Sequence, residues 1–267
     1  MTDKEIIKMI ERNPIIIKNI ESPSNDVKLA AIKKDGSVIQ YIKNPTEEMK
    51  EEAVKNSIRA IQFIENPSYE MKKYAVERAW NTLDYIERPN EELIKIGIKQ
   101  KGWAIKYAKI PSLELQKLAI EQDYDSIKYI NNPLEEIQVL AVKKNYEALR
   151  YIENPTINVV KIAVKENEAA INFISNMDED KMVTLLKINI LVLKYFINSI
   201  SKETLEVALK EEISKEDVEE KYVRDFINCN SISIKNRNIS MDKIIFIYKF
   251  GSNKAKKIAV DEKLKIR

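Results

Sequence analysis

Few side chains in this sequence are suited to catalysis or metal binding. The chain contains no histidine, which is the commonest general base and metal ligand at neutral pH. It contains one cysteine, Cys229, which alone can form neither an intramolecular disulfide nor a cysteine-based zinc site. The sequence also lacks a glycine-rich phosphate loop and clustered metal ligands. We therefore expect no enzymatic activity, no cofactor and no bound metal.

The remaining candidate residues are ones that bind macromolecules. If Trp80 and Trp103 are exposed, they form the best protein-binding hot spot in the chain, although each could instead fill its own turn. A stripe of lysines recurs in register with a repeat described below, and it could follow nucleic-acid phosphates or an acidic partner. Its alternative is a solvated helix surface with ion pairs between residues i and i+4. The stripe consists of Lys33, Lys55, Lys99, Lys143, Lys165 and Lys187.

Charge is unevenly distributed, although the net charge is only +3. Residues 211–220 hold six acids and one lysine, whereas residues 232–267 hold ten Lys or Arg and three acids. A charge run is commonly a solvated face, and the alternative is a docking surface. In the basic segment we predict that Lys254, Lys256 and Lys257 contact a partner.

A regular repeat must position all of these residues. Prolines recur at intervals of 22 residues, at Pro23, Pro45, Pro67, Pro89, Pro111, Pro133 and Pro155. A fixed period of this length is typical of helical repeat proteins. We number positions by their distance after the proline of each repeat.

The first half of each repeat predicts an amphipathic helix. Position 4 is apolar, position 8 is small and position 9 is branched, as in Met49, Ala53 and Val54. Asparagine precedes the proline in several repeats, so we expect it to be the N-cap, with proline in the first helical position. These asparagines are Asn44, Asn66, Asn132 and Asn154.

The second half predicts a shorter helix of about two turns, apolar at positions 16, 18 and 19. Position 18 is aromatic in every repeat: Tyr41, Phe63, Tyr85, Tyr107, Tyr129, Tyr151 and Phe173, continued by Tyr195. We interpret these rings as a continuous core with hydroxyls reaching the rim. Their alternative is a surface on which bases stack. A two-helix unit of this size cannot bury its own core, so successive units must stack.

The predicted fold is therefore all-α, a right-handed α-solenoid of tandem 22-residue two-helix repeats. Residues 1–22 are expected to form an amino-terminal cap or half repeat, residues 23–176 seven regular repeats, and residues 177–267 degenerate repeats and a helical carboxyl-terminal cap. The sequence shows no signal-peptide core and no apolar run long enough to span a bilayer. We expect a cytoplasmic protein, in a bacterium or in a host cell if a phage encodes it.

The repeat units resemble those of known families. NPSYEMKKYAV and NPLEEIQVLAV are similar to the opening of the long helix in leucine-rich repeat variant and HEAT-like proteins, and the resemblance covers about residues 1–198. It implies an α-solenoid that binds macromolecules. Glutamine and lysine replace the arginine that HEAT-like units often carry, so an internal arginine ladder is not expected. In composition and repeat style the chain is also similar to proteins of phages and mobile elements.

Three hypotheses about function follow. The first is a protein-binding inhibitor or adaptor, such as a phage-encoded inhibitor of a bacterial defence nuclease of the anti-CRISPR kind. The second is an RNA- or DNA-binding solenoid that uses the lysine stripe and residues 232–267. The third is a HEAT-like DNA glycosylase, because such enzymes hold nucleic acid with tryptophan, aspartate and arginine; here Trp80, Asp84 and Trp103 would serve. We expect no membrane and no small-molecule substrate.

Overall fold

The computed structural model describes residues 1–234 and 239–265, and in these residues the chain is all-α, with no strand. The α-helices are α1 (Asp3–Arg12), α2 (Asn25–Lys34), α3 (Glu47–Asn56), α4 (Tyr69–Arg78), α5 (Glu91–Gln100), α6 (Leu113–Gln122), α7 (Glu135–Lys144), α8 (Ile157–Glu166), α9 (Glu179–Leu186), α10 (Lys202–Ile213), α11 (Glu220–Asn228), α12 (Lys243–Phe250) and α13 (Asn253–Lys265). The short helices are of 3₁₀ type: η1 (Pro14–Asn19), η2 (Gly36–Tyr41), η3 (Ile58–Phe63), η4 (Trp80–Tyr85), η5 (Gly102–Tyr107), η6 (Tyr124–Tyr129), η7 (Tyr146–Tyr151), η8 (Glu168–Phe173) and η9 (Ile190–Tyr195).

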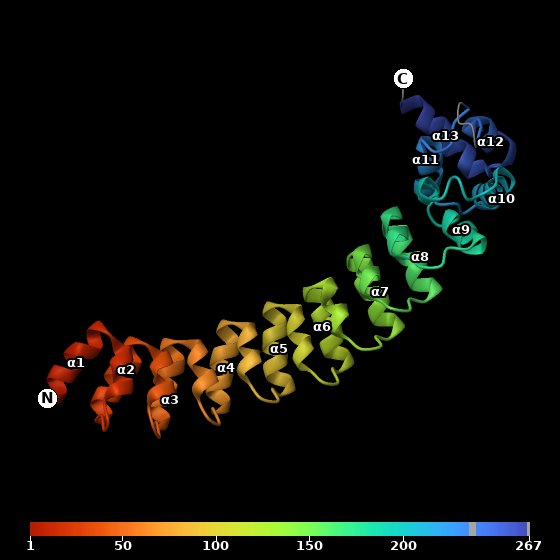
Figure 1. Ribbon diagram of the computed structural model, residues 1–267. Coiled ribbons are helices and arrows are strands. Elements are labelled where there is room, and N and C mark those ends of the chain that lie inside the picture. The colour runs from red at the N-terminus through yellow and green to blue at the C-terminus, as the bar shows by residue number, and fades with distance from the viewer. Residues whose placement is uncertain (235–238, 266–267) are drawn as a thin grey trace. The chain divides into compact units, whose positions relative to one another are not determined.

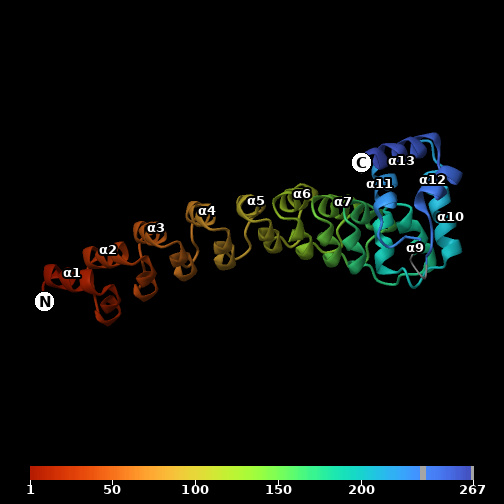
Figure 2. The same cartoon turned by 90° about the horizontal axis from the view of Figure 1, so that it is seen from above.

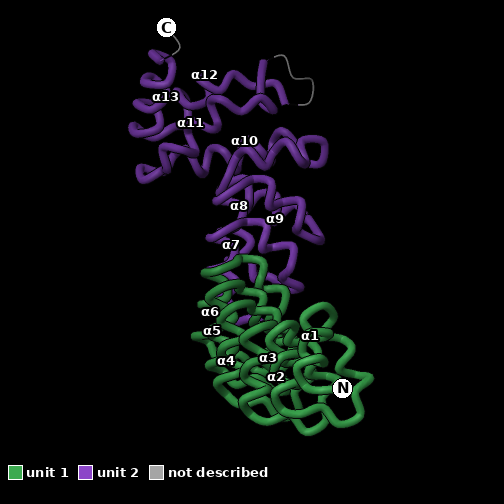
Figure 3. Tube along the Cα trace, turned by 90° about the vertical axis from the view of Figure 1, so that its left-hand side faces the viewer, with its two compact units in different colours: residues 1–132 green, residues 133–267 purple. Residues whose placement is uncertain are grey.

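The helices alternate in pairs, as an α-solenoid requires. From α1–η1 to α8–η8, each pair joins a ten-residue α-helix to a six-residue 3₁₀ helix. The chain divides into two compact units, residues 1–132 and residues 133–267, which Figure 3 colours separately. Within each unit neighbouring pairs contact one another. The predicted all-α solenoid is thereby confirmed.

In unit 1, helices α1–α6 lie side by side in chain order, and η1–η6 form a second row beside them (Figure 1; Figure 2). The core lies between the rows. The small residue at position 8 is completely buried where α-helices approach one another, as at Ala31, Ala53 and Ala119. This contact pattern links each repeat to its neighbours, so the repeats bury a core that no single repeat could form.

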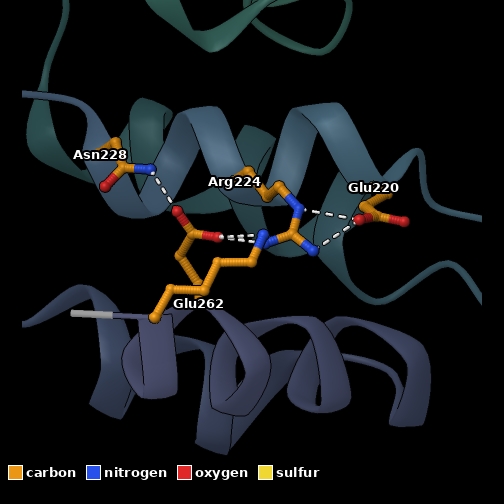
Figure 4. A network of polar contacts seen from close by, with 5 residues as sticks. Glu220, Arg224, Asn228 and Glu262 are labelled. Atoms are coloured by element: carbon orange, nitrogen blue, oxygen red, sulfur yellow. Dashed lines mark hydrogen bonds and ion pairs between the residues drawn. The ribbon is translucent and has the colours of Figure 1, made fainter. Parts of the chain in front are cut away.

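Unit 2 contains the pairs α7–η7, α8–η8 and α9–η9, followed by α10–α13. Helices α11 and α13 lie against each other, joined by a polar network (Figure 4). Arg224 in α11 pairs with Glu220 at 2.6 Å and also with Glu262 in α13, and Asn228 donates to Glu262 over 3.0 Å. The buried side of α11 carries Phe226, which is completely inaccessible to solvent.

The burial pattern of the short helices corrects one prediction. Positions 15 and 16 face the core, and Val38 and Ile39 are accordingly only 1% and 2% exposed. Position 18, the last residue of the 3₁₀ helix, is exposed in some repeats, as at Tyr41 (42%) and Tyr85 (40%), and half-buried in others, as at Tyr107. The interpretation of the aromatic ladder as a continuous core was wrong, since none of its rings is fully buried.

The predicted N-caps were also wrong. The helix begins two residues after the proline, and the residue directly after the proline is the cap; Thr46 Oγ1, for example, accepts from the Met49 N–H at 3.3 Å. In four repeats the residue before the proline instead occupies the left-handed region, with φ near 50° at Asn44, Asn66, Arg88 and Asn132, and Asn176, before Met177, does the same. Asparagine tolerates this region better than most residues, which explains its recurrence there.

The caps give a paired prediction for stability. Ser68 accepts from the Met71 N–H at 3.2 Å, whereas Leu134 occupies the same place in α7 without a side-chain cap. Ser68→Ala should lower the free energy of unfolding by about 1 kcal/mol, and Leu134→Ser should raise it by about the same amount. Denaturant unfolding of both variants measures this. Equal effects of the same sign would contradict the cap assignment.

Candidate protein-binding surface on the 3₁₀ row

The outer side of the 3₁₀ row in unit 1 combines aromatic rings with charged side chains from neighbouring repeats. Position 18 supplies a ring in each repeat, and position 17 supplies Lys106 in η5 and Lys128 in η6. Each of these lysines reaches a tryptophan at the start of the preceding 3₁₀ helix. Two clusters of similar construction result, one around each tryptophan.

The Trp103 cluster is tightly held. The indole Nε1–H donates to Asp125 Oδ1 at 2.7 Å, and Lys128 Nζ lies 3.7 Å from the centroid of the indole ring. Lys128 also pairs with Asp125 at 2.8 Å, and Tyr129 meets the indole edge-on with centroids 6.1 Å apart. Trp103 is half-buried, and a second cation, Lys101 Nζ, lies 4.8 Å from the centroid of the same ring.

The Trp80 cluster repeats this arrangement one repeat earlier. Lys106 Nζ lies 5.6 Å from the Trp80 ring centroid and 3.8 Å from Asp84. The Tyr107 hydroxyl donates to Asp84 Oδ1 over 2.6 Å. Burial raises the pKa of Tyr107, and the hydrogen bond to Asp84 raises it further, so this hydroxyl remains a donor at neutral pH.

The charges of the two clusters balance. Lys106 faces Asp84 and Lys128 faces Asp125, and beside them Lys101 pairs with Asp123 at 2.8 Å. Each cation lies within reach of a carboxylate, so this surface offers rings and paired charges rather than a run of unpaired cations. We call Trp80, Asp84, Lys106, Tyr107, Trp103, Asp125, Lys128 and Tyr129 the ring surface.

The Trp103 cluster predicts a pH effect. Burial opposes ionisation of Asp125, but hydrogen bonds from Lys128 and the Trp103 indole outweigh it, so the pKa of Asp125 lies below its ordinary value of about 3.9. A carboxylate with a lowered pKa stabilises the fold above the unfolded-state value, and this contribution is lost as the pH falls through the folded-state pKa. In a Trp80→Phe background, Trp103 fluorescence should therefore change below about pH 4. The same variant with Asp125→Asn should lack that transition, and a transition well above pH 4 would contradict the assignment.

The lysine stripe lies elsewhere, on the α-helices and, for Lys187, directly after α9. Five of its members are exposed and Lys187 is half-buried. Lys55 pairs with Glu51 of its own helix at 3.6 Å, which is the predicted i,i+4 alternative. In unit 2, Lys165 pairs with Glu219 at 2.5 Å and Lys187 pairs with Glu211. Two carboxylates of the acidic run 211–220 therefore pair with two lysines of the stripe. Lys165 and Lys187 are thus engaged within the chain.

The three carboxyl-terminal lysines predicted to contact a partner lie on α13. Lys254 and Lys257 are exposed, and Lys256 is half-buried with its Nζ 5.9 Å from the Tyr248 ring centroid. Lys256, Tyr248 and Val260 line a mainly apolar groove of about 360 Å³ between α12 and α13. Residues 235–238 and 266–267 of the predicted basic segment lie outside the described residues.

The residues considered for chemistry are placed as follows. Cys229 is a free thiol and is buried. Asp84, the acid of the glycosylase hypothesis, is exposed and is engaged by Tyr107 and Lys106. Among residues 1–234 and 239–265, no three His, Cys, Asp or Glu side chains gather as metal ligands would. The helices described here also include none long and apolar enough to cross a membrane.

The sequence predicted Trp80 and Trp103 as partner-binding residues but did not indicate the lysines and Asp125 that contact them. The available signal was position 17, which is cationic at Lys106, Lys128 and Arg150 beside the ring of position 18. No protein-family model, curated protein or solved structure matches the chain.

Proposed function

We propose that the protein is a protein-binding scaffold, an inhibitor or adaptor, and that the ring surface of unit 1 is its main contact. The observation that carries this proposal is the fixed, half-exposed ring of Trp103, held from one side by Asp125 and covered by Lys128. Tryptophan and tyrosine dominate the energetics of protein interfaces. A ring already held in one orientation loses little conformational freedom when a partner binds.

The charge pattern supports a protein partner over a nucleic acid. Binding to a phosphate backbone depends on cations that are free to replace its counterions. On the ring surface Lys106 and Lys128 are each near a carboxylate, and a polyanion would have to compete with Asp84 and Asp125 for them. A protein surface with mixed charges can instead be complementary to both members of each pair.

Affinity capture with the full chain tests the proposal. The chain is used as bait in lysate from the organism that encodes it, with and without nuclease treatment. We expect a protein that is retained after nuclease treatment, is lost when Trp80 and Trp103 are both replaced by alanine, and is retained by Lys33→Glu/Lys99→Glu. Capture that depends on nucleic acid, or on Lys33 and Lys99 rather than the tryptophans, would overturn the proposal in favour of the nucleic-acid-binding alternative.

A further inference from the structure

The repeat of η5 departs from its neighbours next to the ring surface. Position 19 is a buried isoleucine in the surrounding repeats, for example Ile64, Ile86 and Ile130, each 5–6% exposed. In this repeat the position is Ala108. A side chain that would fill the space between repeats is therefore shortened to a methyl group.

A groove of about 420 Å³ lies at this point in unit 1. Its apolar wall consists of Ala108, Ile94 and Leu115, with the ring of Tyr107 beside them. Tyr107 also belongs to the ring surface, where its hydroxyl is held by Asp84 at 2.6 Å. The groove and the ring surface therefore meet at one side chain.

Ile110 stands on the edge of the groove and is 94% exposed, more than any other large apolar side chain in the described residues. The equivalent place holds an asparagine with a positive φ at Asn44, Asn66 and Asn132, and it holds Arg88 in the preceding repeat. Ala108 thus stands where other repeats have a larger, buried apolar residue. Ile110 stands where other repeats have a polar turn residue, and it is apolar and exposed. Together they form an apolar depression beside an apolar projection, which is a feature of binding surfaces.

The rim of the groove is basic. Arg88 is 84% exposed at its side chain, and its nearest carboxylate is Glu87 at 3.8 Å, itself 90% exposed. Lys109 is a second exposed cation on the rim. The one carboxylate in the lining, Glu91, accepts a hydrogen bond from Ser112 at 2.7 Å. An exposed ion pair at this distance contributes little to stability. Arg88 and Lys109 are therefore available to bind an acidic group of a partner.

We propose that this groove receives a segment of the partner protein in which a large apolar side chain is flanked by carboxylates. The apolar side chain occupies the space left by Ala108 and contacts Ile110 and the half-buried Tyr107, and the carboxylates face Arg88 and Lys109. This inference rests on the proposed function, since it assigns the chemistry of the partner segment that docks beside the ring surface.

The repeat itself supplies the matched variant. Ala108→Ile/Ile110→Asn gives this repeat the residues of the following one, Ile130 and Asn132, so the variant should fold and should unfold at a temperature equal to or above that of the parent. A displayed library of random peptides is selected on the full parent chain, and the enriched peptides are measured against parent and variant by fluorescence polarisation. We expect enriched peptides with a large apolar residue next to Asp or Glu, and at least tenfold weaker binding to the variant. No enrichment, enrichment of basic peptides, or equal binding to the variant would overturn the inference.

The ring surface and the groove can be tested separately. Trp103 does not line the groove, so Trp103→Ala should retain the selected peptides while losing the captured partner. If the partner is lost with Trp103→Ala but binds the Ala108→Ile/Ile110→Asn variant as it binds the parent, the groove inference fails and the proposed function stands. If Trp103→Ala keeps the partner, the proposed function fails, whatever the peptides show.

Discussion

Trp103→Ala should weaken binding of the captured partner by about 30-fold or more, which corresponds to about 2 kcal/mol for a hot-spot residue. The loss has two origins. The substitution removes the half-exposed ring, and it leaves Asp125 and Lys128 without the group that they orient. Titration calorimetry or surface plasmon resonance with the purified partner measures the change.

Two variants separate the ring from its supports. Trp103→Phe keeps an aromatic ring but loses the indole donor to Asp125, so we expect affinity between those of the parent and the alanine variant. Asp125→Asn keeps the shape of the supporting side chain and removes its charge, so it should weaken binding less than Trp103→Ala. Unchanged affinity of Trp103→Ala, in a variant whose unfolding curve shows that it is folded, would contradict the proposed contact.

Ile105→Ala should lower the free energy of unfolding by about 2–5 kcal/mol, the largest stability effect that we predict. Ile105 is completely buried in η5, between the two rows of unit 1. Shortening it removes apolar burial and leaves a cavity that packed neighbours on both sides cannot fill. Because each repeat is supported mainly by its neighbours, hydrogen exchange should rise first in η5 and in α5 and α6, which pack against it.

The same substitution five residues later is the matched control. Ile110→Ala truncates an identical side chain that is 94% exposed, so it should change stability by about 0.5 kcal/mol or less. Similar destabilisation by the two substitutions would contradict the assignment of Ile105 to the core. Ile110→Ala also removes part of the proposed groove contact. It should therefore weaken peptide binding while leaving the free energy of unfolding almost unchanged.

The periodic apolar residues were sufficient to predict the helix pairs and most of the core. Ala53 and Val54 are buried as their positions predicted, because an α-helical period was correctly assumed for the first half of the repeat. The second half adopts a 3₁₀ helix, and Tyr41 and Tyr85, which end η2 and η4, lie at the surface rather than in the core. Six residues contain too few turns for the apolar pattern to fix which positions face the core.

The prediction of the N-cap residues was wrong for a local reason. Both Asn44 and Thr46 can cap a helix, and proline can take the first helical position, so residue preferences favour Asn44. The chain instead uses Asn44 to turn with φ 50° and caps with Thr46. Both residues satisfy the preferences for a cap, so residue types alone do not decide between them.

Candidate site residues were predicted where a single residue type carries the signal, as with Trp80 and Trp103. The residues that contact Trp103 come from the following repeat. Predicting Lys128 and Asp125 would therefore require knowing how η6 is positioned relative to η5. The ion pair between Lys165 and Glu219 joins segments far apart in the sequence, and no periodic pattern marks it. Ala108 was visible as an exception to the repeat, but its groove depends on side chains from three repeats.

Site-specific photo-crosslinking most directly tests whether the 3₁₀ row is the binding side of unit 1. A benzophenone amino acid replaces Tyr85, which is 40% exposed on that row, or Lys99, which is exposed on α5. Both variants keep Trp80 and Trp103. We predict a crosslink to the captured partner from residue 85 and none from residue 99; a crosslink from residue 99 with none from residue 85 would contradict the account.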